Sequence, residues 1–126
     1  MPSIREKVPY LPERIQGLGW LAANLSWSWN RNARRLFSLL DDPLWHLTRH
    51  NPLAMLRRLD PSRLSECSRD PRFLDLYDRV IEESKREQSF MGTWYHEEFP
   101  EARERPIAYF CAEFGLHNSV PIYSGG

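Results

Sequence analysis

The chain has 126 residues, of which 41% are hydrophobic, and its 17 basic and 17 acidic residues give a formal net charge of zero. This length allows one domain, or one domain and the beginning of another. The balanced charge argues against a nucleic-acid-binding protein. The sequence has no apolar stretch of membrane-spanning length and no signal-peptide core, so we expect a cytoplasmic protein with no nucleic-acid or membrane partner.

Residues 11–30, "LPERIQGLGWLAANLSWSWN", are predicted to form the first helix, because five apolar residues recur at helical spacing. These residues are Ile15, Leu18, Ala22, Leu25 and Trp29. Gly17 and Gly19 each cost up to about 1 kcal/mol relative to alanine, which indicates either weak first turns or another backbone packed closely there. Trp27 and Trp29 are two residues apart and cannot share a helix face. We therefore expect one in the core and the other at a contact with another part of the protein.

Residues 32–40 continue as a second helix, with Leu36, Phe37 and Leu40 facing inward. Four Asp-Pro or Asn-Pro pairs then follow at intervals of nine or ten residues. They are Asp42-Pro43, Asn51-Pro52, Asp60-Pro61 and Asp70-Pro71. Each pair predicts a helix start, because the Asp or Asn side chain caps free backbone N–H groups and proline fits the first helical position. The first three of these helices must be short, of about two turns each.

The fourth Pro-initiated helix, "DPRFLDLYDRVIEESKREQS", is predicted to be the longest. Five side chains fall on one stripe at helical spacing. They are Phe73, Tyr77, Val80, Ile81 and Ser84.

Residues 90–106 are predicted to form an acidic linker, with Trp94 and Phe99 as aromatic anchors. Residues 107–112, "IAYFCA", form an apolar run that is typical of a strand buried on both faces. The fold class we expect is therefore mainly α: a helical N-terminal domain (1–89), the linker, and then the first strand and glycine loop of a truncated α/β lobe (107–126). A single strand cannot form a sheet, so its partners must lie elsewhere.

No metal site is expected from the histidines and cysteines. His46 and His50 are four residues apart, but the HExxH pattern of zinc enzymes is absent. Cys67 lies among helical signals and Cys111 lies inside the apolar run. We expect both to be reduced thiols, as is the default in a cytosolic protein.

Several segments together resemble the N-terminal part of the bacterial and archaeal-type α-glucan (glycogen/maltodextrin) phosphorylases. These segments are "NLSWSWN", "WHLTRHNP", "FLDLYDRV", "TWY" and "IAYFCAEFGLHNSVPIYSGG". The resemblance covers essentially the whole chain. It departs from the family in small ways, since Ser26 stands where the family often has an aromatic residue and Cys111 where it often has serine.

The resemblance implies two GT-B, Rossmann-like lobes and cleavage of α-1,4-glucans by orthophosphate, which releases glucose 1-phosphate. It also implies pyridoxal phosphate, bound to a lysine of a distant lobe that this chain does not contain. By position, Gly125 and Gly126 match the opening of a glycine loop near the substrate phosphate and sugar, and Glu113 matches an acid that faces the cleft. Backbone N–H groups without a nearby Cβ suit an anion, and strand ends hold ligands in open α/β sheets.

The expected partners are thus an α-1,4-glucan and phosphate, and the resemblance allows a homo-oligomeric parent enzyme. No catalytic residue, cofactor-binding residue or metal ligand is expected in this chain, which alone should be inactive. Two alternatives remain: a GT-B transferase of the glycogen or starch synthase kind, and a self-standing helical interaction domain. The synthases place their first strand near the N-terminus, and an interaction module needs neither an orphan strand nor a glycine loop.

Overall fold

A computed structural model describes residues 10–89, 92–101, 108–111, 115 and 117. The described residues are mainly helical and contain no strand. The elements, in chain order, are η1 (Glu13–Ile15), α2 (Gly17–Ala23), η2 (Leu25–Ser28), α3 (Arg31–Leu40), α4 (Asp42–Leu47), α5 (Pro52–Arg58), α6 (Pro61–Cys67), α7 (Pro71–Ser89) and α8 (Trp94–Glu98), where η marks a 3₁₀ helix. The expectation of a mainly α region is confirmed.

Side-chain caps define the helix starts between residues 30 and 72. The Oδ1 atoms of Asn51, Asp60 and Asp70 accept bonds of 2.8–3.0 Å from backbone N–H groups just downstream. The predicted start at Asp42-Pro43 is wrong by one residue, because Asp41 caps α4 through the N–H of Leu44. The three short helices and the long α7 are otherwise confirmed.

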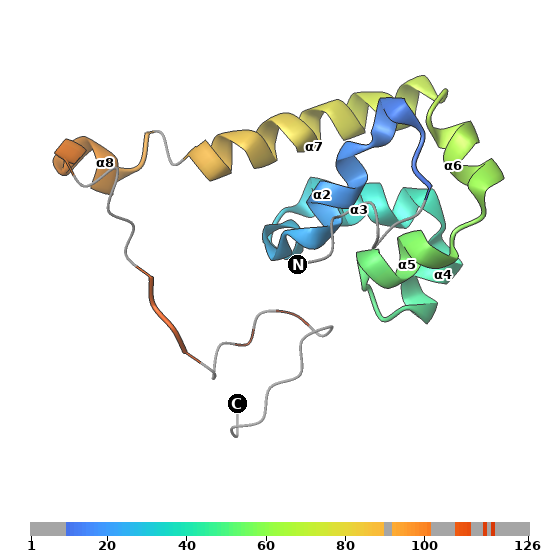
Figure 1. The fold of residues 1–126 in the computed structure, drawn as a ribbon, viewed down its shortest axis with the longest axis horizontal. Helices are drawn as coiled ribbons and strands as arrows, with labels where there is room; N and C mark the ends of the chain where they lie inside the picture. The colour runs from blue at the N-terminus through green and yellow to red at the C-terminus, as the bar shows by residue number, and fades with distance from the viewer. Residues whose placement is uncertain (1–9, 90–91, 102–107, 112–114, 116, 118–126) are drawn as a thin grey trace.

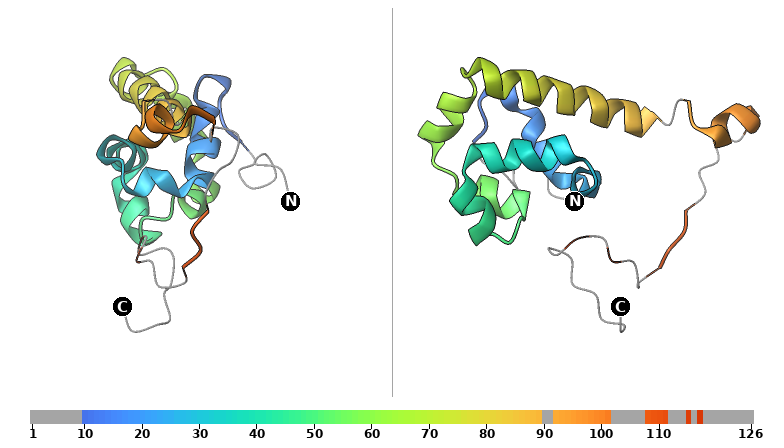
Figure 2. Two further views of the ribbon diagram at one scale, coloured as in Figure 1. Left: turned by 90° about the vertical axis from the view of Figure 1, so that its left-hand side faces the viewer. Right: turned by 180° about the vertical axis from the view of Figure 1, so that it is seen from behind.

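The helices from η1 to α7 form one bundle. α7 runs along one side, α2 and α3 lie against it, and α4 and α5 lie on the side away from it (Figure 1). α6 connects the two sides at one end, as the view from behind also shows (Figure 2). One core of buried apolar side chains joins these layers. Its largest fully buried members are Trp27, Phe37, Ile15, Leu18, Leu21, Leu36, Leu40, Met55, Leu64 and Val80.

The predicted single helix over residues 11–30 is wrong, because the chain forms η1, α2 and η2 instead. The break lies at Asn24, whose backbone is extended (φ −103°, ψ 111°) and whose side chain accepts a bond from the N–H of Ser26. A short amide side chain that bonds the nearby backbone competes with the helix. The break changes which tryptophan faces the core: Trp27 is 2% exposed, and Trp29, expected on the buried stripe, is 67% exposed.

Gly17 lies where α2 meets α7. Its N–H donates to the hydroxyl of Tyr77 over 2.9 Å. A Cβ at this position would stand 2.5 Å from that hydroxyl and 2.9 Å from the Cδ1 of Ile81. The sequence left two explanations for this glycine, weak first turns or a closely packed backbone. The structure shows close packing at Gly17, but the neighbours are side chains of α7 and not backbone.

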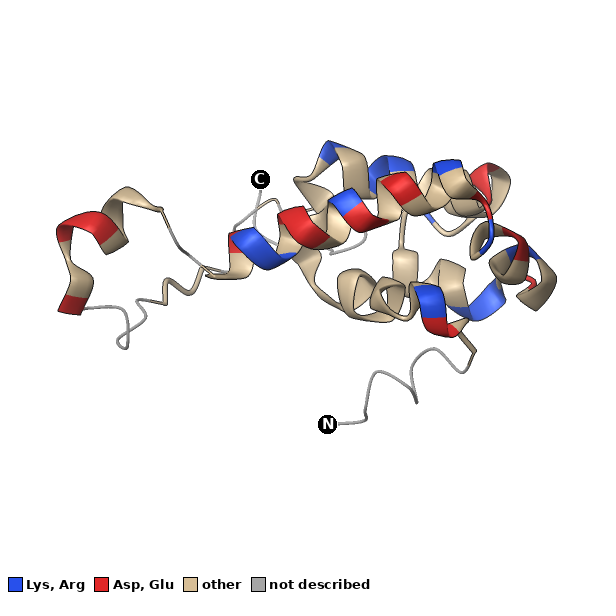
Figure 3. Ribbon diagram, turned by 90° about the horizontal axis from the view of Figure 1, so that it is seen from above, with Lys and Arg blue, Asp and Glu red and all other residues tan. Residues whose placement is uncertain are grey.

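Polar contacts join α7 to the N-terminal elements at two further points. The Arg14 guanidinium pairs with Asp78 at 2.6 Å. Further along α7, the Glu83 carboxylate accepts bonds from the amides of Asn30 and Asn32. Basic and acidic residues alternate along the outer face of α7 (Figure 3), as expected for a solvated helix face.

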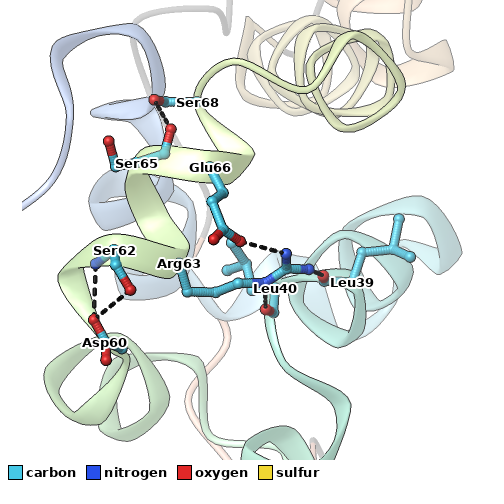
Figure 4. A network of polar contacts seen from close by, with 8 residues as sticks. All are labelled: Leu39, Leu40, Asp60, Ser62, Arg63, Ser65, Glu66 and Ser68. Atoms are coloured by element: carbon cyan, nitrogen blue, oxygen red, sulfur yellow. Dashed lines mark hydrogen bonds and ion pairs between the residues drawn. The ribbon is translucent and has the colours of Figure 1, made fainter.

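Arg63 of α6 caps the C-terminus of α3. Its Nε donates to the Leu40 carbonyl over 2.8 Å and one terminal nitrogen donates to the Leu39 carbonyl over 3.0 Å, while Glu66 holds the other side of the guanidinium (Figure 4). The last carbonyls of a helix have no partner within it and carry a partial negative charge. One cation thus ties α6 to α3.

The two cysteines are free and differ in exposure. Cys67 is buried in the core at the end of α6. Burial raises the pKa of its thiol above the ordinary value, although the nearby Arg63 acts in the opposite direction.

The region after α7 differs from what the sequence predicts. The expected linker contains α8, which lies beyond the end of α7 and apart from the bundle (Figures 1 and 2). Trp94 and Phe99 are 69% and 41% exposed and contact each other, so they do not anchor the segment in the core. The expected strand is absent from residues 108–111, where Tyr109 and Phe110 are exposed. A strand requires a neighbour for its backbone bonds, and the described residues offer none.

Candidate functional site

The residues that the sequence assigned to substrate binding, Glu113, Gly125 and Gly126, lie outside the described residues. Their roles remain predictions. Of the segment that carries them, the structure describes only residues 108–111, 115 and 117. His117 is the described residue of this segment that reaches an organised group of side chains on the bundle.

That group, called here the aromatic–histidine cluster, consists of Trp27, Phe37, Trp45, His46, His50 and His117. Trp27, at its centre, meets Phe37 edge-on at 6.0 Å and Trp45 edge-on at 5.8 Å between ring centroids. Phe37 and Trp45 stack on each other at 5.6 Å. Edge-to-face and offset-stacked rings are the favoured aromatic geometries, so these three rings pack in a favourable arrangement within the core of the bundle.

The turn after α4 places His50 on this surface. The N–H of Arg49 bonds the His46 carbonyl and the N–H of His50 bonds the Trp45 carbonyl, the paired bonds of a Schellman motif. Arg49 and His50 have φ angles of 53° and 58°, a region that non-glycine residues visit rarely and at some cost. The turn sets the His50 ring 5.0 Å from Trp45 and its Nε2 atom 3.1 Å from the Nδ1 of His46.

His117 completes the cluster from the far end of the chain. Its ring lies edge-on to Trp27 with a centroid distance of 4.6 Å. Burial, with smaller contributions from His50 and from Arg34 of α3, lowers the pKa of His117 below the ordinary value for histidine. The cluster thus favours a neutral imidazole at position 117.

A second feature is a hollow beside η2 and the end of α7. It is lined by Asn24, Ser26, Glu87 and Gln88 and measures about 480 Å³. Trp29 follows η2, three residues after Ser26, and is exposed. The side chains that line the hollow are polar, and Glu87 is the charged one.

Neither a cluster of metal ligands nor a buried lysine occurs among the described residues. No three His, Cys, Asp or Glu side chains gather closely enough in the described part of the chain to bind a metal ion. Lys85 is exposed on α7, whereas a Schiff-base lysine is usually activated by a desolvated pocket or a cationic neighbour; Lys7 lies outside the described residues. None of the helices in the described ranges is both long and apolar enough to cross a membrane.

Comparison with known proteins gives the chain a family. Residues 11–120 match the model of a family described as "Protein of unknown function (DUF3417)". The chain belongs to this family. No solved structure matched the chain.

Curated relatives of this DUF3417 chain are phosphorylases. The maltodextrin phosphorylase of Thermococcus litoralis is 40% identical over 116 residues, which are 92% of this chain and 14% of that protein. The glycogen phosphorylase of Mycobacterium tuberculosis is 37% identical over 122 residues, 93% of this chain and 14% of that protein. That of Aquifex aeolicus is 33% identical over 111 residues, with 88% and 15% covered.

The resemblance stated from the sequence motifs is therefore confirmed: the chain is homologous to the N-terminal region of maltodextrin and glycogen phosphorylases. It spans about one-seventh of the length of these relatives. The aromatic–histidine cluster, by contrast, was missed by sequence reasoning. The spacing of His46 and His50 was weighed only against a zinc motif, and nothing in the sequence joins His117 to Trp27, 90 residues earlier.

Proposed function

We propose that the chain is the N-terminal part of an α-glucan phosphorylase. Such an enzyme is a hexosyltransferase that cleaves α-1,4-glucans with orthophosphate to give glucose 1-phosphate. The observation that supports this most strongly is the 40% identity to a maltodextrin phosphorylase over 92% of the chain. The matched curated relatives bear phosphorylase names, so neither a glycogen or starch synthase nor a self-standing interaction domain is favoured.

In this proposal the bundle is a helical domain joined to catalytic lobes of GT-B type. Pyridoxal phosphate, when bound, supplies the phosphate group that assists phosphorolysis, and its lysine belongs to a part of the enzyme not present in this chain. Glu113, Gly125 and Gly126 lie near the substrate phosphate and sugar, with the glycines leaving room for backbone N–H donors. The parent enzyme is cytoplasmic and can be a homo-oligomer, and the 126-residue chain alone is inactive.

A chimera tests the proposal. The matched region of the Thermococcus litoralis maltodextrin phosphorylase is replaced by this chain, and glucose 1-phosphate release from maltoheptaose and phosphate is measured. We expect the chimera to be active and the 126-residue chain alone to produce nothing above a blank. The same enzyme with the region deleted is the control. A chimera that binds pyridoxal phosphate as the parent does, but is no more active than the deletion, would contradict the proposal.

The glycine pair is tested in the same chimera by Gly126→Val. A Cβ would displace the backbone donors, and one preorganised donor typically contributes about 3 kcal/mol to transition-state stabilisation. We expect kcat/KM per folded molecule to fall at least about tenfold. If Gly126 is needed only for the backbone conformation of a turn, the variant should have a lower melting temperature but an unchanged kcat/KM per folded molecule. That result would refute the assigned role.

A further inference from the structure

The structure contains a contact that the proposed function does not use. We propose that the side chain of His117 docks on Trp27 of the aromatic–histidine cluster, and that this docking requires a neutral His117 imidazole. The docked group is thus a side chain of this same chain, 90 residues after Trp27. The inference concerns the attachment of His117 to the bundle and does not depend on the phosphorolysis reaction.

Three aromatic rings of the bundle form the side of the site that His117 contacts. Trp27, Phe37 and Trp45 are 2%, 0% and 6% exposed, and each ring contacts the other two. The separation between His117 and Trp27, 4.6 Å, is the shortest between any two rings of the cluster. A side chain 90 positions away in the sequence therefore packs on Trp27, in the edge-on geometry that rings prefer.

Two basic side chains from different elements of the bundle lie near His117. His50 projects from the turn after α4 and Arg34 from α3, and both disfavour a charged His117. His46 contacts His50 on the side of α4. The carboxylate of Asp42 lies 3.8 Å from the Nε2 atom of His46. Burial of the His117 ring acts in the same direction and is the largest cause of its lowered pKa.

The turn that holds His50 supports a role for it beyond packing. Arg49 and His50 both adopt left-handed backbone angles, and consecutive strained residues persist only where the surrounding structure fixes them. With this backbone conformation, the His50 ring lies against Trp45. In this position His50 interacts electrostatically with His117. The turn thus places the imidazole of His50 near that of His117.

The direction of the pH dependence follows from linkage. The undocked imidazole has the ordinary pKa of about 6.5, and the docked imidazole has a lower one. Above the undocked pKa both states are neutral and docking has its full strength. As the pH falls below the undocked pKa, the undocked state takes up protons first, so docking weakens until the pH passes below the docked pKa. Each unit between the two values changes the docking constant tenfold.

Nuclear magnetic resonance of the 126-residue chain with labelled histidine tests the proposal. At pH 7.5 we expect nuclear Overhauser effects between the ring protons of His117 and the indole protons of Trp27. His117 should titrate at a lower pH than the same residue in a peptide of residues 113–121, and the Overhauser effects should disappear as it protonates. Resonances of Val80, which is buried in the core on α7 and lies outside the cluster, report any general unfolding over the same pH range.

Two variants separate charge from shape. His117→Phe keeps an aromatic ring that cannot be charged, so its contacts with Trp27 should persist at pH 5. Arg34→Gln removes one facing cation from an exposed position of α3, so the pKa of His117 should rise towards that of the peptide. Absence of the contacts at pH 7.5 would overturn the proposal. A pKa of His117 at or above the peptide value would overturn it too, because attraction of imidazolium to the indole ring would then dominate.

Discussion

Two parts of the chain are rich in aromatic side chains and use them in opposite ways. In the bundle, Trp27, Phe37 and Trp45 are buried. In the segment from α8 to residue 111, the large aromatic residues are mostly exposed. They are Trp94, Phe99, Tyr109 and Phe110, at 69%, 41%, 78% and 92%. The difference shows that aromatic content does not make a core. Burial requires apolar faces from several elements that close over one another, and α2, α3 and α7 supply such faces whereas α8 has no described neighbour of this kind.

The largest expected effect contrasts one tryptophan from each part. Trp27→Ala should lower the free energy of unfolding by about 3–5 kcal/mol, because it leaves a large cavity against Phe37 and Trp45. Trp94→Ala, on α8, should change it by less than about 0.5 kcal/mol. Urea unfolding followed by circular dichroism measures both. Equal losses in the two variants would mean that α8 contributes to the same core, and the contrast drawn here would be wrong.

A pair of glycines sharpens the same contrast. Gly17→Ala should destabilise the bundle by about 1–3 kcal/mol, because the new methyl group overpacks the contact with Tyr77. Adding Tyr77→Phe removes the hydroxyl, so the double variant should lose less than the sum of the single changes.

The matched control is Gly92→Ala. A Cβ there meets nothing within 4 Å, and its φ of +75° makes the strain local. Since Gly92 lies beyond the end of α7, the unfolding transition of the bundle should stay where it is. A shift as large as that of Gly17→Ala would show that the packing at Gly17 is not the cause.

The cap formed by Arg63 should have a smaller effect. Arg63→Met keeps much of the apolar stem but removes the donors to the Leu39 and Leu40 carbonyls, and we expect a loss of about 1 kcal/mol. Glu66→Gln leaves both backbone bonds in place and removes only an exposed ion pair, which should change stability by less than about 0.5 kcal/mol. If the two variants lose the same amount, the ion pair rather than the cap carries the contribution of Arg63.

The smallest expected effect is a gain. Arg49→Gly should stabilise the bundle by about 0.5–1 kcal/mol, because glycine adopts the left-handed angle of this turn without the clash of a Cβ. Arg35→Gly, at an exposed position inside α3, should instead cost about 1 kcal/mol. Thermal unfolding of both variants measures the difference. A loss in Arg49→Gly would mean that the arginine side chain contributes more than its backbone strain costs.

The helices between residues 31 and 89 were largely predictable from the sequence, because their caps and apolar spacing are local signals. The one-residue shift of the α4 start arises because Asp41 and Asp42 are both able to cap, and the sequence does not say which one does. Residues 11–30 were misread because apolar periodicity continues through Asn24, while the competing bond from its side chain to Ser26 interrupts the helix. The same break puts Trp29, which was expected on the apolar stripe, on the surface, while Trp27 lies in the core.

The candidate site was far less predictable. Glu113, Gly125 and Gly126 were assigned through family resemblance alone, and they lie outside the described residues. The aromatic–histidine cluster depends on contacts between residues far apart in the chain, such as Trp27 with His117, and no periodicity encodes such a pair. The strand predicted at residues 107–112 was inferred from apolar character, but a strand exists only when a second strand pairs with it, and that information is not local.

Because Cys67 is buried, the rate of its reaction with a thiol reagent can report opening of the bundle under native conditions. Cys67 is 3% exposed and the pKa of its thiol is raised, so little of the thiol is in the reactive thiolate form. A thiol reagent should therefore modify the more accessible Cys111 first and reach Cys67 only when α6 detaches from the core. The slow phase of labelling would then report how often the bundle opens, with no denaturant added and no extrapolation.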